Sequence, residues 1–437
     1  MQKIKSFTFY SIAIIGLGWL VLTGSACNQN SSMASEQKQA VESKPENLAA
    51  GSSSSQIDAA QKFIEKNPTQ AKGYNSLTVA YIRSARETGD FSLNSQAETA
   101  VTRALELEPE NPDAQKLKIS LMLTFHRFAE ARDAAMILQP KFPQSAFYYG
   151  ALTDANVELG NYKEAVDNIQ KMVDLNPNME SYARVSYVRS LHGDPNGAIE
   201  AMQTAAKIAD PMAKEPQAWC LVHLGDEFYK TGNYVEAEKQ YDAALELFPG
   251  YHFALAGKGR ARAAQNDFEA AVNFLSEANN RVPNTEDVIQ LGDVYTKLGK
   301  SDEANKQYEL AQFIEQKFGN IDQRRLALLW ADHDTKLDEA LEIAAREHEN
   351  RKDIFSADIY AWCLYKKNRF QEAKKIIAEA MRLKTKDARI FYHAGMIEKS
   401  LGNKKAAAGY LRKALETNSA FDVLQAENAK KALEEVG

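Results

Sequence analysis

The 437-residue sequence has few of the residues that hold metal ions or carry out covalent chemistry. It contains three cysteines and seven histidines, and these form neither a CxxC pair nor a His-x3-His pair. Since a structural zinc site needs a cluster of four such ligands, we predict no metal site. No glycine-rich phosphate loop and no Gly-x-Ser-x-Gly element occurs. We therefore predict a protein that is not an enzyme and has no cofactor.

Clustered positive charge is also missing. The chain has 53 lysines and arginines against 59 aspartates and glutamates, a net charge of −6. Nucleic-acid binding needs lysines and arginines gathered on one surface, so we predict no nucleic-acid partner. The segment Asp332-His333-Asp334 is the one group that suggests acid–base chemistry, and we interpret it as a solvated turn between two helices.

The N-terminus carries a targeting signal. Lys3 and Lys5 precede an uncharged, largely apolar stretch over residues 7–22, and small residues follow up to Cys27. This order is typical of a secretory signal, which we place at residues 1–26. The end of the stretch resembles the lipobox of bacterial lipoproteins, with Ser25, Ala26 and Cys27 in register and Gly24 where leucine is usual. Ordinary cleavage and a retained membrane anchor remain as alternatives to lipidation of Cys27.

The resemblance to lipoproteins implies a location in the cell envelope. The chain would be secreted across the inner membrane and anchored through lipids on Cys27. By analogy with enterobacterial lipoproteins, Asn28 instead of aspartate favours the periplasmic side of the outer membrane. Residues 27–55 are rich in serine, glutamine and glutamate and have no aromatic residue, so we predict a disordered tether.

Beyond residue 56 the sequence repeats with a period of about 34 residues, which is typical of helical repeat arrays. Alanine marks each repeat, at Ala97, Ala131, Ala165, Ala198, Ala237, Ala271, Ala304, Ala340, Ala373 and Ala407. A small residue stands twelve positions before most of these alanines, as Gly225 does before Ala237. Turn residues such as Gly232-Asn233 lie between the two, and proline closes several repeats. Each repeat therefore predicts two helices joined by a short turn.

The repeat over residues 218–249 carries Leu224-Gly225-x2-Phe228, then Ala237-x3-Tyr241, then Pro249. This pattern resembles the tetratricopeptide repeat, and the resemblance extends from Asp58 to the C-terminus. It implies an all-α, right-handed superhelical solenoid of about ten helix pairs over residues 56–437, with capping helices at 57–67 and 426–436. Segments 75–90 and 391–403 also resemble bacterial tetratricopeptide lipoproteins that have no assigned activity.

Two local features modify this regular pattern. The step from Ala198 to Ala237 is the longest between marker alanines and contains an insertion at 211–216, where we expect a possible break in the solenoid. Cys220 and Cys363 fall in equivalent first helices four repeats apart, too far to form a disulfide, and we interpret both as buried packing residues.

The resemblance implies that the first helix of each pair lines a concave surface that binds partners. Aromatic residues and arginines there are the side chains that tend to anchor a partner. The partner-binding residues predicted on these helices are Arg184, Tyr187, Trp219, Asp226, Tyr229, Arg260, Asp293, Trp362, Tyr365 and Tyr392. Because the strip also contains Asp154, we expect a peptide with basic residues or a folded protein with a basic edge.

Three functions are compatible with this strip. The first is a scaffold that binds a peptide or protein partner and has membrane contact only through its lipid anchor. The second is a receptor for a glycan or small ligand, since aromatic residues also stack on sugars. The third is a non-catalytic subunit of an envelope enzyme or assembly complex. The sequence does not indicate an oligomeric state.

Overall fold

The computed structural model describes residues 48–318 and 323–437, and it divides into two compact units. The N-terminal unit comprises residues 48–124, and the C-terminal unit comprises residues 125–437 apart from 319–322. The predicted signal peptide and residues 27–47 of the predicted tether lie outside the described residues. No β-strand occurs in the two described ranges, and the predicted all-α class is confirmed.

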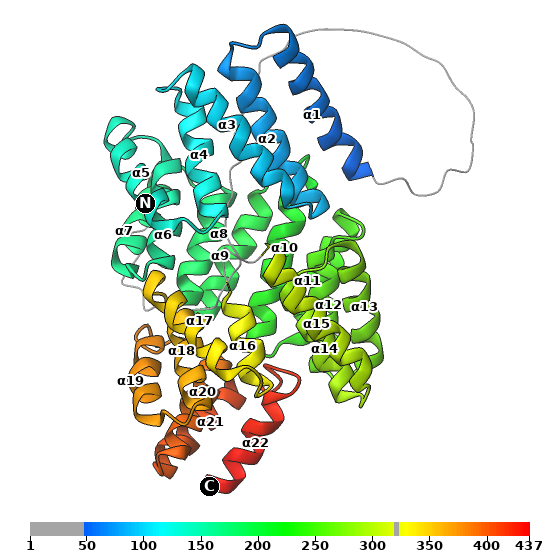
Figure 1. Cartoon of the computed structure of the whole chain (residues 1–437), viewed down its shortest axis with the longest axis vertical. Coiled ribbons are helices and arrows are strands. Elements are labelled where there is room, and N and C mark those ends of the chain that lie inside the picture. The colour runs from blue at the N-terminus through cyan, green and yellow to red at the C-terminus, as the bar shows by residue number, and fades with distance from the viewer. Residues whose placement is uncertain (1–47, 319–322) are drawn as a thin grey trace, which may run out of the picture. The chain divides into compact units, whose positions relative to one another are not determined.

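The N-terminal unit consists of four helices (Figure 1): α1 (Leu48–Lys66), α2 (Ala71–Thr88), α3 (Ser92–Leu107) and α4 (Pro112–Thr124). The helix that we predict to start at Ile57 starts at Leu48. Residues 48–55, which we assign to the tether, form about two turns of this helix. The sequence offers a reason in Leu48, Ala49 and Ala50, which have high helix propensity and precede the glycine and serines.

The C-terminal unit begins with α5 (Phe128–Leu138), a short 3-10 helix η1 (Gln139–Lys141), α6 (Ala146–Glu158), α7 (Tyr162–Leu175), α8 (Met179–Leu191) and α9 (Pro195–Ile208). It continues with α10 (Lys214–Lys230), α11 (Tyr234–Leu247), α12 (His252–Ala264), α13 (Phe268–Arg281), α14 (Thr285–Lys297) and α15 (Ser301–Phe318). It ends with α16 (Arg324–Asp332), α17 (Leu337–Asn350), α18 (Ile354–Lys366), α19 (Phe370–Ala380), α20 (Ala388–Ser400), α21 (Lys404–Thr417) and α22 (Gln425–Val436).

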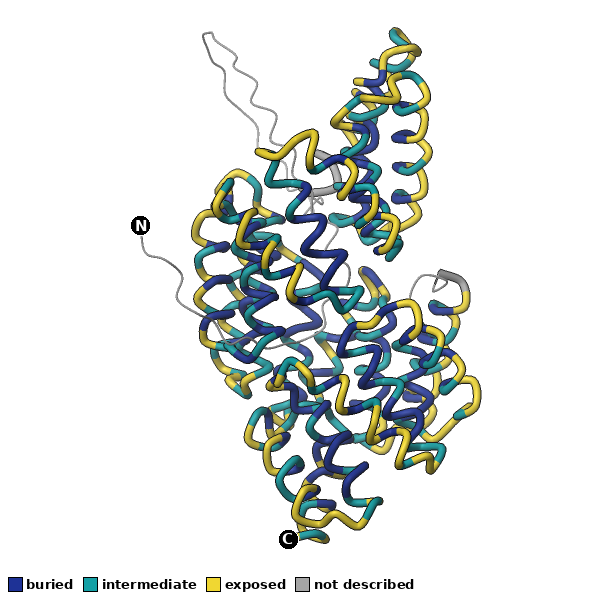
Figure 2. Tube along the Cα trace, turned by 90° about the vertical axis from the view of Figure 1, so that its left-hand side faces the viewer, coloured by how far each residue is buried: buried dark blue, intermediate teal, exposed yellow. Residues whose placement is uncertain are grey.

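The marker alanines lie on the buried side of the second helix of each pair. All ten fall on second helices, from Ala97 on α3 to Ala407 on α21, and none is more than 2% exposed. Figure 2 shows buried positions recurring along the helices, with exposed positions on many of them, while α6 and α8 have no exposed residue. The helix-turn-helix repeat predicted from the period is therefore confirmed.

The turns inside the pairs have the predicted backbone conformation. Gly160, Gly193, Gly232, Gly299 and Gly402 have φ between 70° and 79°, the left-handed region that glycine adopts at low cost. Asn266 takes the same role with φ 62°. The residue after several of these positions then caps the next helix, as Asn233 does by accepting a hydrogen bond from the backbone of Glu236.

Within the C-terminal unit, helices far apart in sequence pack together. Arg351, which follows α17, forms an ion pair with Glu158 at the end of α6. The Tyr162 hydroxyl on α7 accepts a hydrogen bond of 2.9 Å from the backbone N–H of Ile354, which begins α18. The repeats near the C-terminus therefore fold back against the repeats that begin the unit.

The division between the two units falls between Thr124 and Phe125. The insertion at 211–216 lies inside the C-terminal unit, where it forms the turn before α10 and the first residues of that helix. A break at this insertion stays a prediction. Cys220 and Cys363 are buried and free, as predicted, with exposures of 0% and 1%.

Tyr241 on α11 shows how tight the helix pairs are. Its ring is 0% exposed. A Cβ atom at Gly225 on α10 or at Gly257 on α12 would lie 2.5 Å from the ring. The ring therefore fills the space between two helices that approach it at glycine positions, and it has no room to move toward either one.

We expect Gly225→Ala to lower the free energy of unfolding of the C-terminal unit by about 1–3 kcal/mol, because overpacking forces the Tyr241 ring or a helix to shift. The matched control is Gly409→Ala on α21, where an added Cβ atom meets nothing within 4 Å. Alanine there should leave stability unchanged or raise it slightly. Urea unfolding followed by circular dichroism measures both, and equal midpoints for the two variants would contradict the tight packing around Tyr241.

Candidate partner-binding site

All ten predicted partner-binding residues lie on first helices of the C-terminal unit. Arg184 and Tyr187 lie on α8, Trp219, Asp226 and Tyr229 on α10, Arg260 on α12, Asp293 on α14, Trp362 and Tyr365 on α18, and Tyr392 on α20. None of these residues is exposed, and six of them are buried. Their role in binding a partner stays a prediction, and their present contacts show what each side chain does within the fold.

Arg184 forms a buried ion pair with Asp154 of the preceding pair. Its guanidinium donates two hydrogen bonds to the carboxylate, of 2.8 Å from Nε and 2.7 Å from Nη2, and the two side chains are only 6% and 8% exposed. Burial raises the pKa of Asp154, and the charge of Arg184 opposes this rise. The bidentate geometry satisfies both charged groups. Arg184 therefore joins α6 to α8.

Arg260 joins three consecutive first helices. Its guanidinium donates hydrogen bonds to Asp226 of α10 at 2.9 Å and to Asp287 of α14 at 3.2 Å. The Tyr241 hydroxyl also donates to Asp226, at 2.8 Å. Burial favours a raised pKa for Asp226, but His223 and Arg260 outweigh it and lower the pKa. Burial raises the pKa of Asp287 to about 6, with Arg260 opposing the rise.

The ion pairs of Arg184 and Arg260 reduce the negative charge that we expect on the predicted partner-binding surface. We expect a basic partner because Asp154, Asp226 and Asp293 lie on the predicted surface. In the structure Arg184 neutralises Asp154 and Arg260 neutralises Asp226, so these aspartates present no free negative charge to a partner. The arginines lie 30 and 34 residues after the aspartates, and stacking of the repeats places them side by side.

Trp362 is covered on both faces of its indole ring. Tyr365 stacks on one side at a centroid distance of 4.7 Å and His393 on the other at 4.1 Å, both nearly parallel to the indole. The indole Nε1 donates a 2.8 Å hydrogen bond to Asp332, and the residue is 1% exposed. A sugar or peptide therefore has no ring face of Trp362 on which to stack.

The polypeptide between α21 and α22 is bound by helices of earlier repeats. We call residues 418–424 the C-terminal turn. Asn418 is 4% exposed, and its Nδ2 donates a 2.9 Å hydrogen bond to the backbone carbonyl of Tyr229 at the end of α10. The Tyr234 hydroxyl, at the start of α11, donates a 2.5 Å hydrogen bond to Asn418 Oδ1. Both polar groups of this amide are thus satisfied by residues from repeats far earlier in the chain.

Apolar contacts hold the rest of the C-terminal turn. Val423 packs against a buried cluster that includes Leu255 of α12 and Leu291 of α14. Phe421 lies 5.6 Å from Tyr392, measured between ring centroids. On α22, Glu427 forms a 2.6 Å ion pair with Lys297 at the end of α14. We call the surface that carries Tyr229, Tyr234, Asp293 and Lys297 the receiving face.

Asp422 in the C-terminal turn repels two other carboxylates, those of Asp293 and Asp332. Repulsion from it adds to burial in raising the pKa of Asp293, while a hydrogen bond from His333 opposes the rise. Burial and repulsion from Asp422 also raise the pKa of Asp332, to about 6. Arg389 lies 3.9 Å from Asp422 and is the cation that faces it. Negative charge is therefore more concentrated here than at the Arg184 and Arg260 pairs.

The interpretation of Asp332-His333-Asp334 as a solvated turn is wrong for its first two residues. Asp332 accepts the hydrogen bond of Trp362, and His333 Nε2 lies 3.2 Å from Asp293. Burial favours a lowered pKa for His333, but Asp293 outweighs it and raises the pKa. Only Asp334 has an exposed side chain, at 67%. The neighbouring first helices supply partners that a local turn pattern does not reveal.

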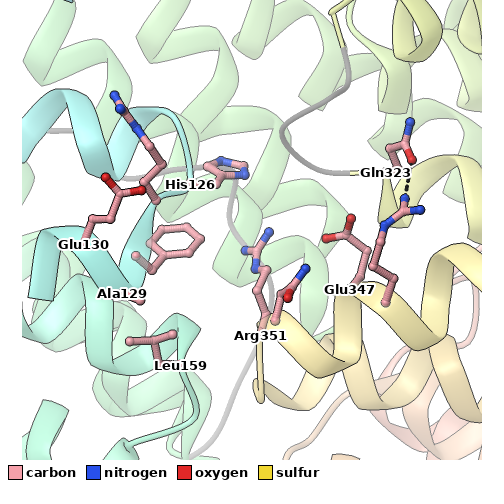
Figure 3. Close-up of a pocket in the computed structure, with 11 residues that line it drawn as sticks. His126, Ala129, Glu130, Leu159, Gln323, Glu347 and Arg351 are labelled. Atoms are coloured by element: carbon pink, nitrogen blue, oxygen red, sulfur yellow. Dashed lines mark hydrogen bonds between the residues drawn. The ribbon is translucent and has the colours of Figure 1, made fainter.

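A separate pocket of about 600 Å³ lies between α5 and the α16–α17 pair. Figure 3 shows His126 and Arg351 pointing into it from opposite sides. The Arg351 guanidinium lies 4.8 Å from the centre of the Phe128 ring, and Arg346 donates a 2.6 Å hydrogen bond to Gln323. Three arginines and two glutamates line the pocket, so it does not favour a ligand of one charge.

The described part of the chain has neither a metal-ligand cluster nor a membrane-spanning helix. No three His, Cys, Asp or Glu side chains within it lie close enough together to hold a metal ion. No helix within it has both the length and the hydropathy needed to cross a bilayer. Cys27 lies outside the described residues.

The C-terminal turn is a part of the site that the repeat pattern does not predict. The sequence carries one signal of it: Pro177 closes an earlier repeat one residue after Asn176, whereas Ser419 follows Asn418. The non-helical stretch also carries Phe421 and Val423 without a proline. These residues indicate a segment with an apolar contact of its own, but not which helices it contacts.

Comparison with known proteins agrees with the repeat pattern. Residues 222–283 and 388–421 match the tetratricopeptide repeat family. Among solved structures, the chain is similar to one from the APC/C hetero-tetramer Cut9-Hcn1 (14% identity, 83% of this chain, 55% of that chain, TM-score 0.43). It is also similar to yeast Tom70 (14%, 88% and 96%, 0.41) and to the human IFIT1 dimer with PPP-AAAA (13%, 79% and 90%, 0.44).

We expect Asp332→Asn to raise the free energy of unfolding at pH 7 by up to about 3 kcal/mol, at about 1.4 kcal/mol per unit of pKa shift. The folded-state pKa of Asp332 lies above its ordinary value of 3.8, so its ionisation destabilises the fold as the pH rises from about 4 to about 6. Asparagine keeps an acceptor for Trp362 and removes the charge. The gain should therefore disappear near pH 4.

The control is Asp334→Asn, two residues along the same turn, whose exposed side chain should change stability little at either pH. Urea unfolding at pH 4 and pH 7 measures both variants. An Asp332→Asn protein that is equally destabilised at both pH values would contradict the charge repulsion.

Proposed function

Because the chain is a tetratricopeptide repeat protein, we propose that it is a non-enzymatic scaffold that binds a protein or peptide partner. Repeats of this family generally serve as binding surfaces and not as catalytic centres. The buried acids with described contacts are bonded to other side chains of the fold, as Asp154 is to Arg184, Glu227 to Lys230 and Asp358 to His393.

One observation carries this proposal. The receiving face holds a non-helical segment of polypeptide, the C-terminal turn, through hydrogen bonds to Asn418 and apolar contacts with Val423, and an ion pair joins Lys297 to Glu427 on the helix that follows, α22. These are the kinds of contact by which a repeat surface recognises an extended segment of a partner. The surface is thus suited to binding polypeptide.

The alternative of a glycan receptor has less support. Stacking on a sugar requires an accessible aromatic face, and Trp362 has both faces covered. The alternative of a non-catalytic subunit is a special case of the scaffold, in which the partner is itself an enzyme or an assembly factor.

We further propose that the scaffold is secreted and attached by lipids on Cys27 to the periplasmic side of the outer membrane. The support is the order of Lys3 and Lys5, the apolar stretch and the lipobox-like residues 25–27. Several acyl chains on one cysteine provide stable attachment, because each buried methylene contributes about 0.8 kcal/mol.

To test the scaffold, a photoreactive amino acid replaces Lys297 on the receiving face or Lys239 on α11, which has a 61% exposed side chain. Each full-length protein is crosslinked in intact envelopes, and the adducts are identified by mass spectrometry. We expect one partner protein to be captured from position 297 and not from 239. Capture only from 239 would contradict a partner on the receiving face, and no adduct at either position would contradict the scaffold.

The anchor is tested by Cys27→Ser in a Gram-negative host. We expect the wild-type protein to incorporate a labelled fatty acid and to sediment with outer membranes, and the variant to lose the label. Mass spectrometry of the N-terminus distinguishes the alternatives. An unlabelled mature protein indicates ordinary cleavage, and retention of residues 1–26 indicates an uncleaved anchor; either result would overturn lipidation.

A further inference from the structure

We propose that the receiving face is a receptor for a partner segment with the chemistry of the C-terminal turn, and that this turn occupies the face until the partner displaces it. The partner segment would carry an asparagine, an aromatic residue, a carboxylate and an aliphatic residue, in the order of Asn418, Phe421, Asp422 and Val423, and would lead into a helix. This inference rests on the proposed scaffold function and specifies its ligand.

Asparagine at the first position is recognised through both polar atoms of its side chain. The Tyr229 carbonyl accepts from Nδ2 and the Tyr234 hydroxyl donates to Oδ1, so the pair of contacts fits a side-chain amide and rejects a carboxylate or an ammonium group. The amide is buried, and replacing it with an apolar side chain would leave the Tyr229 carbonyl without this donor.

The aromatic and aliphatic positions contribute apolar area. Phe421 and Val423 are each partly buried, Phe421 beside Tyr392 and Val423 beside the cluster of Leu255 and Leu291. Because both side chains are only partly buried, neither of them fills an enclosed pocket. A partner with similar side chains at the same spacing can therefore make equivalent contacts.

The carboxylate position is where the turn meets charges of both signs. Asp422 accepts hydrogen bonds from the backbone N–H groups of Leu424 and Gln425, which begins α22. Arg389 of α20 faces the same carboxylate at 3.9 Å, but Asp293 of α14 and Asp332 of α16 repel it. The turn is thus held by Asn418, by the apolar contacts of Phe421 and Val423 and by α22, while Asp422 at its centre meets both the opposite charge of Arg389 and the like charge of Asp293 and Asp332.

The packing of α22 also favours release. The turn connects α21 to α22, and among the described helices α22 packs mainly against α21, so the turn and α22 can leave without separating another helix pair. Elements with few packing partners commonly open at a lower free energy than the whole fold. A segment of a separate partner binds only those molecules in which the turn has left the receiving face, which we call the open state. The apparent dissociation constant of the segment equals its intrinsic value divided by the fraction of molecules in the open state.

The test uses the full chain and a fluorescent peptide that copies residues 415–428. Asn418→Ala with Phe421→Ala weakens the turn in the protein, and Glu416→Gln on the exposed side of α21 is the control. We expect the peptide to bind the double variant at least about tenfold more tightly than the wild type or the control, because the open fraction rises. A peptide that carries the same two alanines should not bind.

Hydrogen exchange over residues 418–424 is measured on the same proteins, with circular dichroism to confirm that the helices are retained. Faster exchange without peptide binding would show that the exposed face is not a receptor. Unchanged exchange in the double variant would show that the turn is a fixed part of the fold. Either result overturns this inference, whereas the proposed scaffold is judged separately by crosslinking from positions 297 and 239.

Discussion

Close approach of paired helices at small residues is the constraint on which the structure depends. The marker alanines are almost fully buried, and the Tyr241 ring fills the gap between Gly225 and Gly257. Such contacts fix how one pair stacks on the next, and residues about one repeat apart become neighbours. Asp154 and Arg184 are 30 residues apart and Asp226 and Arg260 are 34 apart. The packing period thus also determines which charges meet across first helices.

This dependence explains what the sequence could predict. The repeat period predicts the helix pairs, the buried alanines and the turn glycines, because each depends on local patterns or on the adjacent repeat. It does not predict that Arg351 meets Glu158 or that Asn418 meets Tyr229, with separations of 193 and 189 residues. A repeating pattern describes contacts between neighbours, and the return of the C-terminal helices depends on small changes of angle summed over many pairs.

For the ten predicted partner-binding residues too, the sequence predicts some features, while others depend on how the repeats stack. First helices do carry all ten selected residues, but whether a side chain is accessible depends on its neighbours in three dimensions. Trp362 resembles a partner anchor in sequence, yet Tyr365 and His393 cover its faces. The Tyr365 contact comes from the same helix at i+3, which sequence spacing can reveal. The His393 contact comes from the first helix of the next repeat, and predicting it needs the stacking geometry.

The distribution of charge distinguishes the receiving face from the rest of the fold. Asp154 and Asp226 each meet an arginine in direct hydrogen-bonding contact, as buried carboxylates require. Asp293, Asp332 and Asp422 instead gather around a histidine and a more distant arginine, and the pKa values of Asp293 and Asp332 are raised. These three carboxylates accept hydrogen bonds, but none forms the close arginine pair seen at Asp154 and Asp226, and negative charge gathers where the C-terminal turn meets earlier repeats. Local violations of this kind are expected at sites that exchange one contact for another, and this one lies where a displaceable segment would be released.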